Sequence, residues 1–561
     1  MIRKKALCFY IVGIVLFSSF VGIAQHSKTK TNPDKTIYGE HPKIVNIINF
    51  IRLLEPRDSN ITEDILYQTV VKQVEILKKY KLKGTFLLQY DALVDARYQK
   101  LLKDLDLNEF DIGAWWEIPQ PLVEKAGLQW RGRYPWDWYA HVGFSTGYSL
   151  KEREQLADVY MNDFKNIFGY YPKSVGSWFI DAHTLNYLYE KYQIVASSNC
   201  KDQYGTDGYT LWGGYLNQAY YPSKINSYMP AQHEQNQIPV PIFRMLGSDP
   251  IRQYDEGLGS KRQSVITLEP VYKEGGADSA WVNWYFKTLI EGASMEFGYV
   301  QAGQENSFTW KEMAKGFELQ MPLIARLRDE DKLKVETLSE TGAWFKNHYK
   351  TTPASSVTVN EGLNGSDRKT VWFDSRIYRL NLLWENGTLR FRDIHLFNEK
   401  LPSIYETQKA TSNECSFFTL PFVDGYLWSD KNNIAGLRFK ALLNGKEILL
   451  QGSNPLITDS IKGKLHINWP LTSFNGTIVM DIDEQQIKIK LISPKPVEWF
   501  LDLNTAADKS LPFQDIKPKQ VDCKFEGMAY SIIASQGIFS IASHNIVFRI
   551  SPVKNLIALK F

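Results

Sequence analysis

Residues 176–183, which read GSWFIDAH, predict the fold of the first half of the chain. They follow FGYYP at residues 168–172 and precede a segment of helical periodicity at residues 184–191. The order is therefore a strand, an acidic residue where that strand ends, and a helix. In β/α barrels this end of each strand collects catalytic side chains, because the loops there can vary without damage to the core. Asp181 is therefore a candidate catalytic carboxylate, although aspartate at this position also suits the N-terminal cap of the next helix.

Strand-like and helix-like segments alternate from residue 44 to about residue 330. Strands are predicted at residues 44–51, 84–88, 109–116, 174–180, 194–198, 264–268 and 299–301. Helices are predicted at residues 63–80, 97–106, 150–168, 184–192, 279–290 and 309–329. Such alternation favours a parallel sheet with crossover helices. We therefore predict an α/β region over residues 43–340 that forms an irregular (β/α) barrel.

The pattern changes after residues 351–356, which read TTPASS and are typical of a linker. Short alternating strands and turns follow, and the turns ENG at 385–387 and LNG at 443–445 are strong hairpin signals. We predict an all-β sandwich over residues 356–561.

The N-terminus has the features of an export signal. Arg3, Lys4 and Lys5 precede an apolar segment at residues 6–20 and a small-residue cleavage site at residues 22–24. This order predicts a signal peptide over residues 1–24, followed by a flexible leader over residues 25–42. The apolar segment is short for a spanning helix, so we expect a secreted, periplasmic protein without a membrane span in the mature chain.

Composition narrows the class of partner. The net charge is only +3 and no long basic run is present, which argues against nucleic acid. Aromatic residues make up 14% of the chain, which suits carbohydrate binding as well as sandwich cores. Cys200, Cys415 and Cys523 are far apart and lack metal-finger spacing, so we expect neither a disulfide framework nor a metal or other cofactor.

Residues 159–200 resemble the glycoside hydrolase/polysaccharide deacetylase superfamily of irregular β/α barrels, of the family 57 and 38 type. WFID at residues 178–181 looks like the Trp-Leu-Pro-Glu strand end of family 57, with Asp181 in place of the nucleophilic Glu. VQAGQENSFTW at residues 300–310 is similar to the family's Asp-Gly-Glu-Asn segment, with Gly303 in place of the acid's Asp and Glu305 kept as the second acidic residue. The resemblance covers residues 44–330. With the predicted sandwich behind it, the chain also resembles uncharacterised exported bacterial glycan-degrading proteins.

Two further segments fit the deacetylases less well. EFDIGAWWE at residues 109–117 resembles their second motif, but the two metal-binding histidines are absent. NFIRLLEPR at residues 49–57 stands where their first motif carries an Asp pair. A metal-dependent esterase is therefore the second choice.

Glycoside hydrolysis commonly uses two carboxyl groups, one as acid and one as nucleophile or base. The catalytic candidates are Asp181 as nucleophile or base, Glu305 as acid, Glu269 as an alternative acid, and the strand-end residue Glu117. The candidates for substrate binding are Trp178, His183, Trp115, Trp116, Arg52, Glu55, Trp136, Trp138, His141 and Trp212.

Arg52 and Arg57 offer two interpretations, since each can pair either with a uronate or sulfate of the substrate or simply with Glu55. We predict a glycoside hydrolase that acts on poly- or oligosaccharides. A deacetylase-type esterase and a glycan-binding protein without activity stay open as alternatives, the second because of Gly303.

Overall fold

The computed structural model describes residues 41–542 and 546–561. The predicted signal peptide and the leader up to residue 40 lie outside the described residues. Among the helices of the described part, none has the length and apolar character required to cross a membrane.

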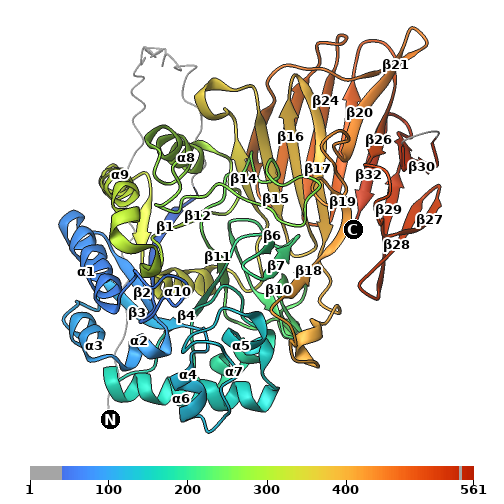
Figure 1. The fold of residues 1–561 in the computed structure, drawn as a ribbon. Helices are drawn as coiled ribbons and strands as arrows, with labels where there is room; N and C mark the ends of the chain where they lie inside the picture. Colours follow the sequence, from blue (N-terminus) through green and yellow to red (C-terminus); the bar gives the residue numbers. More distant parts are fainter. Residues whose placement is uncertain (1–40, 543–545) are drawn as a thin grey trace, which may run out of the picture. The chain divides into compact units, whose positions relative to one another are not determined.

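A curled, mainly parallel sheet forms the first half of the chain (Figure 1). Its central strand β1 is buried at all nine positions, which explains its nearly continuous apolar sequence KIVNIINFI. Only the edge strand β8 runs antiparallel, next to β11, while β13 pairs with β1 beside β12. The order is β12 (Gly298–Ala302), β1 (Lys43–Ile51), β2 (Gly84–Leu88), β3 (Phe110–Trp115), β4 (Ser174–Gly176), β5 (Ala196–Asn199), β11 (Ile242–Arg244) and β8 (Ala219–Tyr220), with β13 at Lys334–Glu336. The predicted irregular barrel is confirmed as an open, curled sheet.

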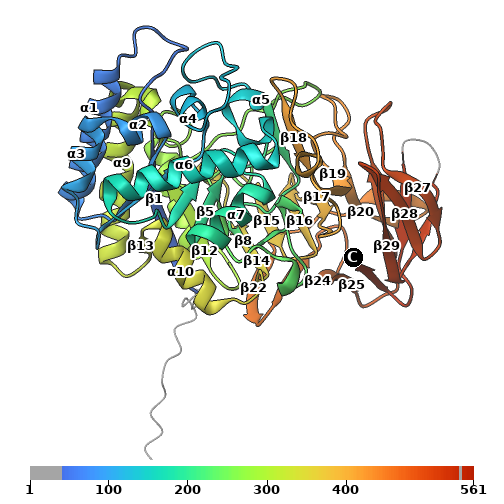
Figure 2. The same cartoon turned by 90° about the horizontal axis from the view of Figure 1, so that it is seen from below.

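Helices lie over the outer side of this sheet (Figures 1 and 2). The helix α6 shows why they form here: Ser149 and Glu152 make a capping box at its start, and Gly169 ends it in the left-handed conformation. The helices are α1 (Glu63–Tyr80), α2 (Tyr90–Val94), α3 (Ala96–Lys103), α4 (Gln120–Lys125), α5 (Ala140–Gly143), α6 (Leu150–Phe168), α7 (Ala182–Tyr192), α8 (Ser279–Glu291), α9 (Thr309–Asp329) and α10 (Leu338–His348). The sequence pattern did not predict α10, which packs against β1 through a 2.7 Å hydrogen bond from Asn46 to Thr341.

The strand predicted at residues 264–268 does not form. Thr267 makes only an isolated bridge with Ser248, and the backbone N–H of Leu268 donates to the carbonyl of Leu246 in a neighbouring loop. The apolar residues of this segment are therefore packed as a loop, which leads directly to Glu269.

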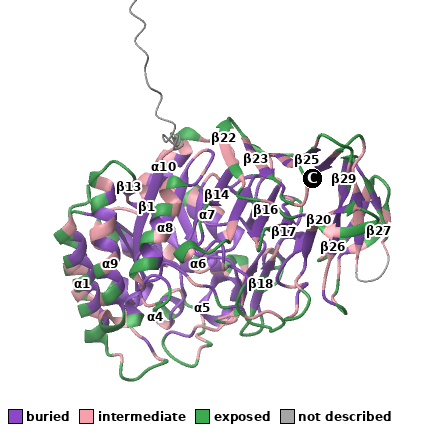
Figure 3. Ribbon diagram, turned by 90° about the horizontal axis from the view of Figure 1, so that it is seen from above, coloured by how far each residue is buried: buried purple, intermediate pink, exposed green. Residues whose placement is uncertain are grey.

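The second half is a sandwich of two antiparallel sheets, as predicted (Figure 1). Phe439 of one sheet and Trp469 of the other meet with ring centroids 5.9 Å apart, and inward positions alternate with partly exposed ones (Figure 3). The first sheet contains β14 (Ser355–Val359), β15 (Lys369–Asp374), β16 (Tyr378–Glu385), β17 (Thr388–Leu396), β20 (Gly436–Leu443), β26 (Glu498–Asn504), β31 (Phe548–Ser551) and β30 (Ile538–Ser540), with β19 (Leu420–Asp424) and β21 (Lys446–Leu449) beside it. The second contains β22 (Leu456–Ile461), β23 (Lys464–Pro470), β24 (Thr477–Asp483), β25 (Gln486–Ile492), β32 (Leu556–Lys560), β29 (Met528–Gln536), β28 (Gln520–Phe525) and β27 (Phe513–Lys517).

A small sheet joins the two halves. The strand β18 (Cys415–Phe418) comes from the sandwich region and pairs in parallel with β7 (Tyr209–Trp212), which forms a hairpin with β6 (Gln203–Thr206). A second small pair, β9 (Pro222–Ser223) and β10 (Asn226–Pro230), lies nearby in the chain. The sandwich region thus supports a hairpin of the barrel region.

Buried charges also fasten the two halves together. Arg379 of β16 forms two hydrogen bonds with Asp393, at 3.1 and 2.9 Å, and an ion pair with Asp202 of the barrel region. Asp202 also accepts from Arg244 at 2.8 Å. The side chains of Arg379, Asp202 and Asp393 are at most 1% exposed, so each charge depends on the others for compensation.

We expect Arg379→Leu to lower the free energy of unfolding by about 3–5 kcal/mol, because it leaves the buried carboxylate of Asp393 without its guanidinium partner and that of Asp202 with Arg244 alone. Chemical denaturation checks this. The control is Arg376→Leu, which removes an ion pair with Glu484 whose partners are 25% and 30% exposed and should cost below about 1 kcal/mol. Equal losses in the two variants would contradict the role given to Arg379.

Candidate active site

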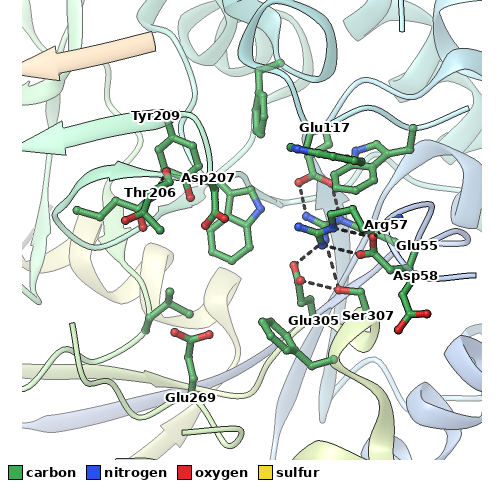
Figure 4. A pocket seen from close by; sticks show the side chains of 18 of the residues that line it. Glu55, Arg57, Asp58, Glu117, Thr206, Asp207, Tyr209, Glu269, Glu305 and Ser307 are labelled. Carbon is green, nitrogen blue, oxygen red and sulfur yellow. Dashed lines mark hydrogen bonds and ion pairs between the residues drawn. The ribbon is translucent and has the colours of Figure 1, made fainter. Parts of the chain in front are cut away.

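A cavity of about 400 Å³ opens at the ends of the parallel strands (Figure 4). Its lining combines aromatic rings with six carboxylates and three cations. The charged residues are Glu55, Asp58, Glu117, Asp207, Glu269 and Glu305, with Arg52, Arg57 and Lys201. A concave site with convergent charged groups is the usual location of enzyme chemistry.

Four neighbouring strand ends deliver the charged centre of this cavity. In sheet order, β12 leads to Glu305, β1 to Arg52, β2 to Gln89 and β3 to Glu117. Arg52 binds Glu117 through two hydrogen bonds of 2.9 and 2.6 Å, and its Nη1 lies 2.9 Å from Oε2 of Glu305. Gln89 donates to Glu117 at 2.7 Å. Burial disfavours the charge of Arg52, but Glu117 and Glu305 outweigh it and raise the pKa of Arg52.

Arg57 forms a second, outer ion pair with Glu55. Its Nε and Nη2 donate to the two carboxylate oxygens at 2.6 and 2.5 Å. The guanidinium also lies 5.5 Å from the ring centroids of both Trp136 and Trp138, and Arg52 lies 4.1 Å from that of Trp136. Burial tends to raise the pKa of Glu55, but the two arginines more than offset this and lower it. The interpretation that Arg57 pairs with Glu55 is the one that the contacts show.

Glu269 and Glu305 have the environment of an acid and a base. Within the described part of the chain, the donors to Glu269 are the uncharged side chains of Thr267, at 2.9 Å, and Gln304. Burial raises its pKa, and Lys201 only partly offsets the rise. Burial also raises the pKa of Glu305, against the opposing charge of Arg52 and the hydrogen bond of 2.5 Å from Ser307. Both carboxyl groups therefore hold a proton more readily than an ordinary glutamate.

The oxygen Oε2 of Glu305 is left without a hydrogen bond in the described structure, although it is close to the Arg52 charge. The other oxygen accepts from Ser307. Oε2 therefore has a lone pair available for a proton from a ligand.

Aromatic rings form the walls of the cavity. Trp178 lines it and is supported from behind by Trp115, with ring centroids 5.4 Å apart, and Trp115 itself stacks on Phe50 at 4.1 Å. Trp136 and Trp138 line the opposite, Arg57 side. These rigid, amphipathic rings suit a ligand with both apolar faces and hydroxyl groups.

Asp181 does not line the cavity. It is fully buried and caps α7 by accepting from the backbone N–H of Thr184 at 2.8 Å. It also accepts from Arg153 at 2.8 Å and from Ser145 at 2.5 Å. The capping interpretation is therefore confirmed. These donors occupy the lone pairs with which Asp181 would attack a substrate, which argues against the predicted nucleophilic role.

Several predicted binding residues also lie away from the cavity. His183 contacts Glu154 at 3.0 Å on the surface of α7, and Trp116 packs in the core against Tyr160. Trp212 donates to Asp424 at 2.7 Å between the two halves of the chain. His141, like Trp115, is absent from the lining.

Sequence reasoning missed several lining residues. The β6–β7 hairpin contributes Asp207 and Tyr209, and the loops add Lys201, Tyr272 and Ser307. The Gly/aromatic composition of residues 205–214 is a local signal for a wall of the site, but of these residues the lining includes Thr206, Asp207 and Tyr209 rather than Trp212. No local sequence pattern identifies Lys201 as a site residue, because only the folded chain brings it to the cavity.

The metal centre of the deacetylases does not fit these residues. Residues 115 and 116, where the resemblance would place metal-binding histidines, are buried tryptophans, and no histidine lines the described cavity. Nowhere in residues 41–542 and 546–561 do three or more His, Cys, Asp or Glu side chains form a group able to hold a metal ion.

Gly303, which stands where family 57 has an aspartate, is required by the backbone. Its φ is +94°, and a Cβ there would lie 2.2 Å from the carbonyl oxygen of Ile48. No side chain fits at this position, so the difference follows from the local path of the chain.

The model of one family matches residues 148–374, and its description is "Domain of Unknown Function with solved-structure structure (DUF3863)". A search among curated proteins gives no match.

Among solved structures, the chain is similar to a possible glycoside hydrolase/deacetylase from Parabacteroides distasonis, with 16% identity over 67% of this chain and 88% of that one and a TM-score of 0.48. It is also similar to a possible polysaccharide deacetylase from Mycobacterium smegmatis, with 12% identity over 56% and 93% of the two chains and a TM-score of 0.35. A family 57 branching enzyme from Thermococcus kodakaraensis shares 10% identity over 55% and 71% of the chains, with a TM-score of 0.31. The roles assigned below rest on this chain's own residues.

We expect Glu269→Gln to melt at a higher temperature than wild type at pH 7. Because the folded-state pKa of Glu269 is raised, its ionisation costs stability as the pH rises from the unfolded-state value, about 4.3, through the folded-state value. Glutamine resembles the protonated form and avoids this cost. Melting curves between pH 4 and 8 should show the difference shrinking toward acid pH. A variant less stable than wild type at pH 7 would argue against the raised pKa.

We expect Asp181→Asn to lower the free energy of unfolding while leaving the turnover rate of the folded protein unchanged. It leaves the buried Arg153 unpaired, which we expect to cost about 3–5 kcal/mol. Turnover per folded molecule, once a substrate is known, should stay near the wild-type value when measured well below the melting temperature. Loss of turnover with an unchanged melting temperature would return Asp181 to the catalytic candidates.

Proposed function

We propose that the protein is an exported glycoside hydrolase that acts on poly- or oligosaccharides. The observation that carries the proposal is the pair Glu269 and Glu305, two buried carboxyl groups with raised pKa values that face one aromatic-lined cavity (Figure 4). Two such groups are what cleavage of a glycosidic bond requires.

The surroundings of the two groups suggest their roles. Burial raises the pKa of Glu269 and so favours its protonated form, which suits the acid that protonates the leaving oxygen. Glu305 lies beside Arg52, which favours its ionised form, and Oε2 is available to remove a proton from water or to attack the anomeric carbon. Glu117 is fully engaged by Arg52 and Gln89 and serves to orient Arg52.

The charge balance favours neutral sugars in this cavity. Arg52 and Arg57 are occupied by Glu117, Glu305 and Glu55, so neither is available for a uronate or a sulfate. The carboxylates outnumber the cations in the lining, which would repel an anionic residue.

Glu269→Gln and Glu305→Gln should each lower kcat by about 10²–10⁴-fold, the usual contribution of a positioned acid or base. Wild-type activity should fall as the pH rises, because Glu269 must keep its proton. Product analysis with a panel of neutral glycans, scoring both sugar fragments and free acetate, checks this. The control Asp207→Asn changes an exposed rim carboxylate and should retain turnover.

Fragments from wild type but not from the two Gln variants would support the hydrolase. Acetate without fragments would favour the esterase. Glycan binding without release of either product would favour a glycan-binding protein without enzymatic activity.

A further inference from the structure

Four arginines gather on the sandwich region, away from the residues that line the barrel cavity. Arg390 and Arg392 both belong to β17 and line the same cleft. Arg438 of β20 is the direct register partner of Arg390 across the strand pair. Arg368, just before β15, completes the group, and like charges opposite each other in a sheet are destabilising. These four residues are called the arginine cluster below.

A cleft of about 250 Å³ opens over this cluster. It is lined by Arg368, Arg390 and Arg392 together with Asp255 and Glu385. The cleft is therefore accessible to a small ligand or to a substituent of a larger one.

The arginines of the cluster differ in their hydrogen-bond and ion-pair partners. Arg368 is paired with Asp255 at 2.6 and 2.8 Å and with Glu385 at 3.0 Å. Arg392 donates only to uncharged oxygens, those of Asn381 and of two backbone carbonyls. The described residues give the Arg390 guanidinium no hydrogen bond and no ion pair, and its Nε is buried.

The nearby carboxylates cannot supply the missing charge. Asp255 and Glu385 are both used by Arg368. Asp502, the register partner of Arg438 on its other side, is occupied by Lys440 at 2.9 Å and Arg549 at 2.8 Å.

Three guanidinium groups and two carboxylates thus line the cleft, and Arg438 adds a fourth positive charge beside Arg390. Burial, together with the charges of Arg438 and Arg392, lowers the pKa of Arg390 to about 9. A half-buried cation with no hydrogen bond or ion pair of its own is costly unless a ligand pairs with it.

We propose that the arginine cluster binds an oxyanion of the sulfate type, carried either by the free ion or by a sulfated sugar. Guanidinium groups match such oxygens in fork geometry, and the unpartnered Arg390 is the group that such an anion would satisfy. This site is separate from the barrel cavity and does not depend on the proposed hydrolase activity.

The test is thermal unfolding with sodium sulfate against sodium chloride at equal ionic strength. A ligand that binds the folded state raises the melting temperature with its concentration. We expect sulfate to raise the melting temperature of wild type and of the control Lys446→Met, which removes one exposed cation of the same sheet. Arg390→Met should lose that response.

The same variant without sulfate should melt at or above wild type, because it removes an uncompensated charge. An equal sulfate response in Arg390→Met would identify a general salt effect and overturn the proposal. No sulfate response in wild type would overturn it as well.

Glu385→Gln gives a second test that does not depend on the folding of the Arg390 variant. It removes a competing carboxylate from the cleft, so titration calorimetry should show sulfate binding several-fold more tightly than to wild type. Unchanged or weaker binding would contradict the proposal.

The source of the anion is distinguished by comparing inorganic sulfate with N-acetylglucosamine 6-sulfate in the same titration. Tighter binding of the sugar would identify a sulfated glycan as the ligand. Equal binding would identify the free ion.

Discussion

The pairing of Arg52 with Glu117 and Glu305 is the constraint on which the candidate site depends. It joins the ends of β1, β3 and β12, which are spread across four adjacent strands of the curled sheet. Placing two glutamates at one end of a parallel sheet without a cation between them would be strongly unfavourable at this burial. Arg52 allows them to be close, and it leaves Glu269, farther from it and bonded by uncharged groups, in a different protonation environment. The two buried carboxyl groups therefore differ in the cation that opposes the rise of their pKa, which is Arg52 for Glu305 and Lys201 for Glu269.

The sequence could predict most of the fold because its signals are local. The apolar run of β1 and the helical periodicity of α6 are each contained in one short segment, and both elements formed where expected. The strand predicted at residues 264–268 was wrong, because an apolar run has the same sequence pattern whether it pairs with a strand or packs as a loop. The helix α10 was missed although Thr337 and Glu340 form a capping box at its start, so a local signal for it was present in the sequence.

The site was predictable only to the level of strand ends. Glu117 and Glu305 follow β3 and β12, so their approach could be expected from a parallel sheet. Asp181 also follows a strand, and only the arrival of Arg153 from α6 shows that it is occupied. Its local sequence therefore fits both a cap and a catalyst. Lys201, by contrast, has no distinguishing neighbours in the sequence at all.

Arg52 and Arg390 show how one residue type acquires opposite properties from its surroundings. Arg52 has more negative charge near it than its own charge requires, so the barrel cavity disfavours anions. Arg390 lies opposite Arg438 across its strand pair and has no carboxylate partner of its own. The cleft over the sandwich therefore favours anions. The two places therefore differ in the charge of the group that each can accept, and the difference comes from the residues around each arginine rather than from the arginine itself.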